Sequence, residues 1–368
     1  MSKLSETYKN YLAPEALIWI DEKKLSAEGI YFSNLEVVKQ IDGADSFSFS
    51  ISDAISFEFE PKYEKLFDLG KKVEIHIGYA DSQKERSELS MLFVGLITAV
   101  NWNFGEENFL DISVEGEDYS FLLMKKKYEA PMQEESISNA VQKILDEVYQ
   151  NVFDKVKIEP TSLIYPQIVN QKESDYLFMD DWAKRIGYQF YIENKNFYFI
   201  PMPTEEQSVL TLHYGQEILS FTPELSIEKE IEQVRVVGLE FSSENEPIVG
   251  EANLEREADD LSSDAGIRAL LRRLNSVKYE VHEAVKSEEE ATQRAESLLD
   301  QFSQNFFRAE LKSVGIPELK AGVTITLLGL GKRFSRDYYV EKAQHSFSEQ
   351  GYETSLTLRG SSSSFSQS

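Results

Sequence analysis

Hydrophobic and polar residues alternate in short runs over the first third of the chain. Residues 47–51 (FSFSI) and 73–77 (VEIHI) place an apolar side chain at every second position, which is the period of a β-strand buried on one face. Further runs of this kind lie at 17–20, 31–38, 91–100 and 109–114. The polar segment 80–88 (ADSQKERSE) predicts a hairpin loop. We therefore predict a first β block over residues 12–119, a barrel or sandwich, after a polar lead at 1–11.

The apolar spacing becomes helical in the middle of the chain. Ser136 is a favoured N-cap residue, and residues 137–148 after it carry apolar side chains on one face. Ser174 predicts the start of a second helix that ends at Gly187, where a left-handed C-cap is expected. These helices and the hairpin that follows them predict a small α+β domain over residues 120–207.

An aromatic hairpin is predicted directly after Gly187. Strand-like runs at 188–193 and 197–200 flank Asn194-Lys195-Asn196. Asparagine tolerates positive φ, which a tight hairpin turn requires. The β pattern then resumes, and we assign residues of about 208–225 to the first β block.

The last third of the chain predicts a second β block over residues 226–360. Expected strands lie at 234–239, 277–281, 306–314, 323–328, 338–347 and 354–358. Ser287 and Glu290 form a capping box that opens a helix. Residues 244–275 are charged and poor in aromatics, so we predict an inserted, partly helical segment there. The serine-rich residues 361–368 are expected to be a disordered tail.

Parts of the two β blocks resemble each other. Each has a glycine (Gly70 or Gly322), an alternating strand, a turn, a strand that reaches an alanine (Ala99 or Ala343), and an alternating strand that ends on a glycine (Gly116 or Gly360). This repeat predicts two copies of one β-barrel with helical segments between them. The fold class is therefore mainly β with α+β insertions.

Composition and charge narrow the classes of function. The net charge is −26, whereas a phosphate-binding surface needs lysine and arginine, so we expect no specific nucleic-acid binding. The chain has no cysteine, which excludes disulfides and thiolate sites. The start MSKLSETYKN lacks the apolar centre of a signal peptide, and no apolar run approaches ~20 residues. We expect synthesis in the cytoplasm, no signal peptide and no membrane anchor.

Residue patterns typical of catalysis are not found in the sequence. The histidines His76, His213, His282 and His345 are scattered and lack a metal-ligand spacing, and we interpret His345, on a strand, as structural. Gly329, Gly331 and Lys332 fail the spacing of a phosphate-binding loop, so a turn between strands is predicted. We therefore expect no catalytic, cofactor-binding or metal-binding residue and no cofactor.

Three charged or aromatic groups have both a functional and a structural interpretation. The pairs Asp180-Asp181 and Asp259-Asp260 could act as acids, but in so acidic a chain a solvated face is favoured. The run 125–127 (KKK) is interpreted as an exposed boundary turn rather than an anion site. The aromatics at 188–199 could stack on sugars, but a hairpin core is favoured.

Three stretches in this order resemble the baseplate hub of contractile tails, the phage late control D family. They also resemble the N-terminal part of the VgrG spike proteins of type VI secretion and related injection particles. The first stretch is residues 174–199 (SDYLFMDDWAKRIGYQFYIENKNFYF). The second is Leu212, Tyr214, Gly215, Ile218 and Phe221, and the third is Gly315, Pro317, Leu319, Gly322, Tyr338, Val340, His345, Tyr352 and Thr354. The resemblance covers about residues 14–360.

The resemblance implies a non-enzymatic structural hub. In such a hub each chain supplies two barrels of the tail-tube type, and a homotrimer forms a pseudo-six-fold ring. One face of the ring would meet the six-fold inner tube or its initiator, and the other the three-fold spike or tip protein. Baseplate wedge proteins would lie at the periphery of the assembled tail-like particle. We expect no spike β-helix after the second barrel, so the piercing tip is expected to be a separate protein.

Two other classes of function are compatible with the sequence. A carbohydrate-binding or carbohydrate-cleaving β protein would use the aromatics around 188–199 and a carboxylate pair. A β protein that binds a membrane surface is disfavoured by the acidity of the chain.

Overall fold

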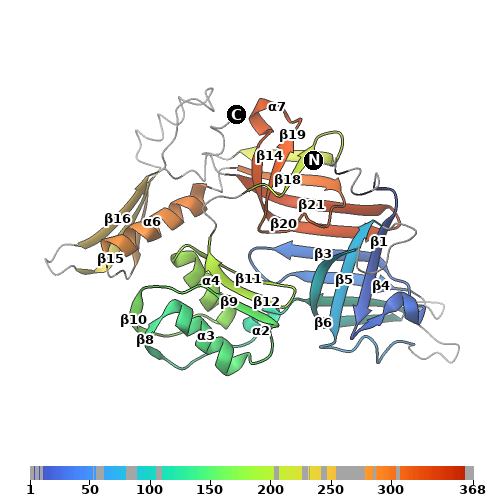
Figure 1. Ribbon diagram of the computed structural model, residues 1–368, viewed down its shortest axis with the longest axis horizontal. Coiled ribbons are helices and arrows are strands. Elements are labelled where there is room, and N and C mark those ends of the chain that lie inside the picture. The colour runs from blue at the N-terminus through green and yellow to red at the C-terminus, as the bar shows by residue number, and fades with distance from the viewer. Residues whose placement is uncertain are drawn as a thin grey trace.

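The computed structural model describes residues 4, 8, 11–52, 54, 62–79, 89–104, 110–202, 207–225, 231, 233–241, 247–253, 278–283, 285, 287–303 and 307–360. The protein is mainly β, with one large curled sheet and a few short helices (Figure 1). The predicted loop at 80–88, the tail at 361–368 and most of the charged segment 244–275 lie outside the described residues.

The first β block is built from the strands that the alternating pattern predicts. They are β1 (Pro14–Ile20), β2 (Lys23–Lys24), β3 (Ser33–Gln40), β4 (Ser46–Ile51), β5 (Lys72–Tyr79), β6 (Ser90–Phe104) and β7 (Leu110–Glu117), with the short 3-10 helix η2 (Leu25–Glu28). They pair in the order β3-β4-β7-β6-β5-β1-β2. The period of two places Phe47, Phe49 and Ile51 inside the block and the serines between them at its surface.

The second β block contains β13 (Leu210–His213), β14 (Ile218–Leu225), β18 (Phe307–Val314), β19 (Thr324–Leu328), β20 (Asp337–Ser348) and β21 (Gly351–Gly360). Our assignment of residues 208–225 to the first block is wrong. β14 pairs antiparallel with β18, and β13 pairs parallel with β19. The physical reason is burial, because Leu212 and Ile218 pack in one core with Phe307 and Leu358.

One strand pairing joins the two blocks. β3 pairs antiparallel with β20, from Leu35 opposite Phe347 to Gln40 opposite Lys342. The blocks therefore form one continuous sheet that runs from β14 at one end to β2 at the other. This sheet is curled, and the closure of each block into a separate barrel stays a prediction.

The middle of the chain folds on a core of its own. Its elements are α2 (Ser120–Met124), β8 (Met132–Ser136), α3 (Ile137–Val148), β9 (Lys155–Ile158), β10 (Ile164–Ile168), α4 (Asp175–Arg185), β11 (Tyr188–Glu193) and β12 (Asn196–Pro201). Both predicted N-caps are confirmed, since the Ser136 side chain accepts the Asn139 N–H and the Ser174 side chain accepts the Leu177 N–H.

The hairpin between β11 and β12 differs from its prediction in one residue. Gly187 has a φ of +69°, as predicted. The turn places Asn194 and Lys195 at positive φ, of 47° and 67°. Asn196 is already in β12, opposite Glu193, so the second left-handed position falls on a lysine rather than on the second asparagine.

Residues 233–303 hold a third folded unit instead of a continuous part of the second barrel. The strands β15 (Gln233–Phe241), β16 (Pro247–Asn253) and β17 (Lys278–Glu283) form a separate sheet that α6 (Glu288–Ser303) covers. Residues 247–253 are thus a strand, although we expected a partly helical segment there. A side chain at Gly250 would lie 2.1 Å from the backbone of Ala291, so only glycine lets α6 pack this closely.

The Ser287 side chain accepts the Glu290 N–H at 3.1 Å, which confirms the predicted cap of α6.

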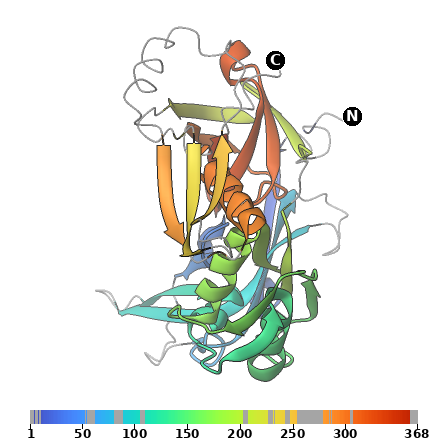
Figure 2. The ribbon, with the colours of Figure 1, turned by 90° about the vertical axis from the view of Figure 1, so that its left-hand side faces the viewer.

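The third unit contacts the small α+β domain. The Ser297 hydroxyl donates to the Lys184 carbonyl at 2.6 Å, and Tyr165 donates to Glu290 at 3.2 Å. Figure 2 shows α6 running from its own sheet towards α4.

Among the described residues, no helix is long and apolar enough to cross a membrane.

Candidate functional site

The histidines are not brought together. They lie on β5, β13, β17 and β20. His76 is buried edge-on against Trp19, with ring centroids 4.9 Å apart, and His282 lies 3.3 Å from Glu280 at the surface. Within the described ranges, no cluster of three or more histidine and acidic side chains could hold a metal ion.

The charged groups that could have formed a reactive site have structural partners. On α4, Asp180 pairs with Lys184 at 2.9 Å, whereas Asp181 pairs with Lys172 and Arg185. The two carboxylates therefore form ion pairs with different cations. Asp259-Asp260 lie outside the described residues.

The lysine run and the glycine turn that the sequence analysis considered as anion sites also have structural roles. The lysine run 125–127 follows α2 and is exposed, and the ammonium of Lys125 lies 5.0 Å from the Phe121 ring centroid. Gly329 and Gly331 both have positive φ in the connection from β19 to β20, so the predicted turn is confirmed, with the short helix α7 (Gly331–Phe334) inside it.

The aromatics of the β11–β12 hairpin point to both faces. Phe190, Phe197 and Phe199 are buried in the core of the small domain, as the core interpretation predicts. Tyr191 and Tyr198 lie on the opposite face, stacked with ring centroids 4.8 Å apart and an interplanar angle of 13°. Tyr191 is 36% exposed. This pair is what remains of the possible sugar-stacking platform.

The residues of the third family-like motif converge on one network beside the joint between the blocks. Gly315 N–H donates to the Tyr352 carbonyl at 2.9 Å, and Ile316 N–H donates to the Thr354 hydroxyl at 3.2 Å. A Cβ on Gly315 would lie 2.1 Å from the Tyr352 ring. The loop between β18 and β19 is therefore held against β21 by contacts that only a glycine permits.

His345 is the centre of this network. Its Nε2 lies 2.8 Å from the Leu319 carbonyl and its Nδ1 lies 2.7 Å from the Tyr352 hydroxyl. A carbonyl can only accept, so Nε2 carries the proton and Nδ1 accepts from Tyr352. Burial lowers the pKa of His345 to about 3, which keeps the ring neutral. The structural interpretation of His345 is confirmed by these contacts.

A cluster of tyrosines fastens the N-terminal lead to this network. Tyr8, Tyr11 and Tyr79 have ring centroids 5.6 to 5.9 Å apart, and Tyr79 also lies 6.0 Å from Tyr352. Tyr79 donates to the Gly315 carbonyl at 2.7 Å, which ties the first block to the loop of the second.

Two carboxylates accept from this cluster. Tyr8 donates to Glu318, and Tyr11 donates to Glu217 at 3.4 Å. Burial raises the pKa of both phenols, and these carboxylates add to the effect. We interpreted residues 1–11 as a polar lead, so sequence reasoning missed that role. The spacing of Leu4, Tyr8 and Tyr11, which pack against the core of the second block, could have indicated this face.

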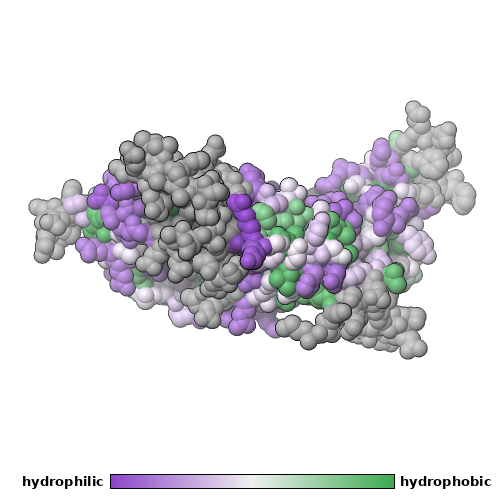
Figure 3. All heavy atoms as spheres, turned by 90° about the horizontal axis from the view of Figure 1, so that it is seen from above, coloured by the Kyte–Doolittle hydropathy of each residue, from purple (hydrophilic) through white to green (hydrophobic). Residues whose placement is uncertain are grey.

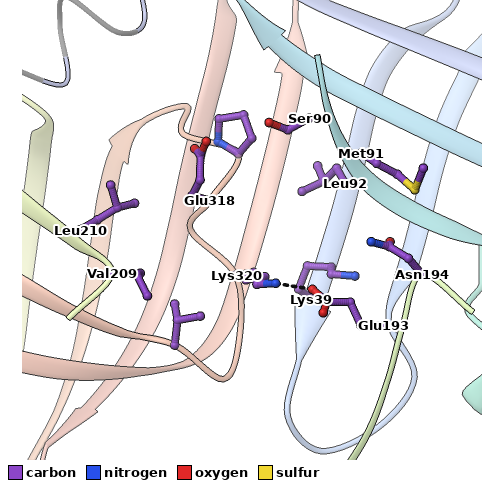
Figure 4. Close-up of a pocket in the computed structure, with 12 residues that line it drawn as sticks. Lys39, Ser90, Met91, Leu92, Glu193, Asn194, Val209, Leu210, Glu318 and Lys320 are labelled. Atoms are coloured by element: carbon purple, nitrogen blue, oxygen red, sulfur yellow. Dashed lines mark hydrogen bonds and ion pairs between the residues drawn. The ribbon is translucent and has the colours of Figure 1, made fainter. Parts of the chain in front are cut away.

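A cavity of about 390 Å³ lies where the two blocks and the hairpin meet (Figure 4). Its lining residues are Lys39, Ser90, Met91, Leu92, Glu193, Asn194, Val209, Leu210, Pro317, Glu318, Lys320 and Val323. Lys320 of the loop pairs with Glu193 of the hairpin across it. This ion pair and the tyrosine cluster hold the same loop from different sides.

A buried charge cluster lies behind the cavity. Lys39 Nζ lies 2.5 Å from Asp45, and both side chains are 10% exposed. Burial lowers the pKa of Lys39, but the Asp45 carboxylate more than offsets this and the pKa is raised. Burial raises the pKa of Asp118 well above its usual range, and the charge of Asp45 adds to that rise. The cluster thus holds one cation between two acids.

The joint connects two blocks whose turns match. Gly70 N–H donates to the Ile97 carbonyl and Ile97 N–H donates to the Lys71 carbonyl, at 2.8 and 2.9 Å. The same pair of bonds, at 2.9 Å each, links Gly322 to Val340 and Val340 to Val323. The strand orders also match, with β3-β4-β7-β6-β5 in the first block and β14-β18-β21-β20-β19 in the second. The glycine turns of the sequence repeat therefore have matching hydrogen bonds, whereas its closing glycines do not correspond, because Ile97 faces Gly116 but Val340 faces Leu358.

Solved structures with the same fold are tail and secretion-system proteins. The 43 kDa tail protein of prophage MuSo2 from Shewanella oneidensis is 12% identical with a TM-score of 0.67, covering 94% of this chain and 98% of that one. The E. coli c3393 protein, a component of the type VI secretion system, is 14% identical with a TM-score of 0.58, covering 90% and 74%. A chain of the Francisella PdpA–VgrG complex is 10% identical with a TM-score of 0.56, covering 98% and 61%.

At these identities the likeness shows a shared fold and nothing more. No curated protein matches the chain. A protein-family description, the Alg8 N-terminal domain, matches residues 17–349, which is most of the chain. The chain therefore belongs to the Alg8 N-terminal domain family.

Proposed function

We propose that this protein is the non-enzymatic baseplate hub of a contractile injection machine. Three copies form a ring that adapts the six-fold inner tube, or its initiator, to a three-fold spike of the VgrG type, with wedge proteins at the periphery. The fold shared with tail proteins and with a chain of the PdpA–VgrG complex supports this proposal.

The observation that carries the proposal is the edge-to-edge joint between two like blocks. A six-fold ring made from three chains needs two equivalent units in each chain. The β3–β20 joint supplies this arrangement, because it places two blocks of matching strand order side by side in one sheet. The loop at residues 315–322 is held on both sides of this joint, because Tyr79 of the first block donates to the Gly315 carbonyl and His345 of the second block bonds the Leu319 carbonyl.

Negative-stain electron microscopy of the purified assembly tests this proposal. We expect axial views with six similar lobes and a central opening. A variant with Lys320→Glu, which places two acids at the Lys320–Glu193 contact, should blur this arrangement by loosening the loop. Axial views with three unlike lobes, or single particles with no ring, would contradict the adapter role.

Carbohydrate binding is the second candidate, because the stacked pair Tyr191–Tyr198 lies on the surface face of the hairpin. A glycan array that identifies a ligand, followed by loss of binding in Tyr191→Ala, would favour it. We expect no glycan to bind, since Tyr191 is only 36% exposed and leaves little ring surface for stacking.

A further inference from the structure

The strands β6 and β20 are equivalent, but only one of them is paired along its whole length. Each has a β-bulge directly after the residue that bonds the glycine turn, at Thr98 and at Glu341. Beyond its bulge, β20 pairs with β21 on one side and with β3 on the other. Beyond its bulge, β6 pairs with β7 alone among the described strands.

The two phenylalanines at the ends of these strands show the difference. Counting from the bulges, Phe104 of β6 corresponds to Phe347 of β20. Phe347 faces Leu35 across the joint and packs against the core of the first block. Phe104 is 63% exposed. The same side chain at the same position is thus packed against a core in one block and 63% exposed in the other.

The opposite end of the sheet has a matching free edge. β3 pairs with β4 and β20, whereas its equivalent β14 pairs with β18 alone in the described part of the chain. Val37 lies opposite Phe47, and Pro223 lies opposite Ala309, in the equivalent strands β4 and β18. Pro223 therefore corresponds to Val37, and Phe221 corresponds to Leu35.

Exposed apolar side chains accompany this edge. Leu219 of β14 is 49% exposed, and Tyr214, which forms a bridge to Ile218 of β14, is 57% exposed. Seen from above, apolar side chains gather on the face over the second block (Figure 3). A free strand edge that carries apolar side chains is a template for pairing with another chain.

We propose that β14 of one copy pairs antiparallel with residues 100–104 of β6 in a second copy, in the register of the β3–β20 joint. The inference rests on the proposed function, since it supplies the interface of the trimer. In this register Phe104 faces Phe221, Asn103 faces Thr222 and Asn101 faces Glu224. No like charges oppose each other, and Phe104 gains the contact that Phe347 has in the intact joint.

Pro223 gives the proposed joint between copies one hydrogen bond fewer than the β3–β20 joint. It lacks an N–H, so the joint between copies cannot include the bond that Val37 can donate. Proline is tolerated at a sheet edge, and the remaining ladder is unaffected. The joint between copies is therefore weaker than the joint within one chain. This order of strength suits an assembly in which each chain folds before the copies associate.

Cysteine cross-linking tests the register, because the parent chain has no cysteine. Ile41 N–H donates to the Glu341 carbonyl, so Glu36 and Ser346 form one of the alternate pairs without hydrogen bonds. Thr222 and Asn103 are their equivalents, and such pairs bring Cα atoms to about 4.5 Å, within disulfide reach. The full-length variant Asn103→Cys/Thr222→Cys should form a disulfide-linked trimer on mild oxidation.

The matched control is Asn103→Cys/Glu310→Cys. Glu310 faces Thr222 from β18, one strand farther from the proposed interface, and should not cross-link. Sedimentation and thermal unfolding of both reduced variants verify that they fold as the parent does. A native trimer that the first pair fails to link, or that the control links equally, overturns this interface and leaves the hub proposal standing. A chain that stays monomeric alone and with spike-type partners overturns both.

Discussion

Gly70 and Gly322 occupy the same place in the two β blocks and adopt the same left-handed backbone, with φ of 80° and 84°. Gly70 donates its N–H to the Ile97 carbonyl, and Gly322 donates its N–H to the Val340 carbonyl. Each acceptor residue directly precedes a β-bulge. At this turn the internal repeat is therefore a repeat of backbone conformation as well as of residue type. This equivalence defines which strand edges of the two blocks correspond.

Alanine at either glycine should destabilise the protein by a similar amount. A side chain in the left-handed region costs about 1–2 kcal/mol, and no atom lies within 3.4 Å of a Cβ at either position, so the cost is conformational. Urea unfolding of Gly70→Ala and Gly322→Ala measures it. Gly315→Ala, which meets the Tyr352 ring, should cost clearly more, and equal losses in all three variants would contradict this ordering.

Replacing His345 should destabilise the second block next to the joint. His345→Ala leaves the Leu319 carbonyl and the Tyr352 hydroxyl without their buried partner, and we expect a loss of about 2–4 kcal/mol in the free energy of unfolding. His282→Ala is the control, because His282 is exposed and should change stability by less than about 0.5 kcal/mol. A loss of similar size in the two variants would count against the network.

His345 also predicts a loss of stability in acid. Its folded pKa is about 3, below the value of about 6.5 in an unfolded chain, so the unfolded state binds the proton first. Stability therefore falls as the pH drops from about 6.5 towards 3. The difference between parent and His345→Gln in urea unfolding at pH 7.5 and at pH 5 isolates this contribution. A difference that does not shrink at pH 5 would show that protonation of His345 is not involved.

Asp118 should have the opposite pH dependence. Burial raises its folded pKa, so the folded state holds a proton more tightly than the unfolded state and this group favours folding more as the pH falls. Asp118→Asn should stabilise the protein at pH 8, by an amount that diminishes in acid. Asp42→Asn removes the same charge from an exposed position and is the control. Destabilisation by Asp118→Asn at pH 8 would mean that its ionised form is needed.

The sequence predicted the strands of both blocks and three N-caps because these depend on local spacing. Ser136, Ser174 and Ser287 act on residues three positions away, and the FSFSI run specifies its own buried face. Local patterns could not assign residues 208–225 to the right block. Their strand β14 pairs with β18, and the whole unit from β15 to α6 separates these two strands in the chain. The network of His345 likewise joins residues far apart in the chain, and the family-like motif indicated its members but not their contacts.

Native mass spectrometry of the purified chain, alone and mixed with a spike-type protein encoded nearby, measures whether three copies assemble. We expect a species of three times the chain mass of 42.2 kDa, alone or once the spike protein is present, and its loss in a Phe104→Asp variant. A species that keeps the mass of one chain in every mixture and at every concentration would contradict it.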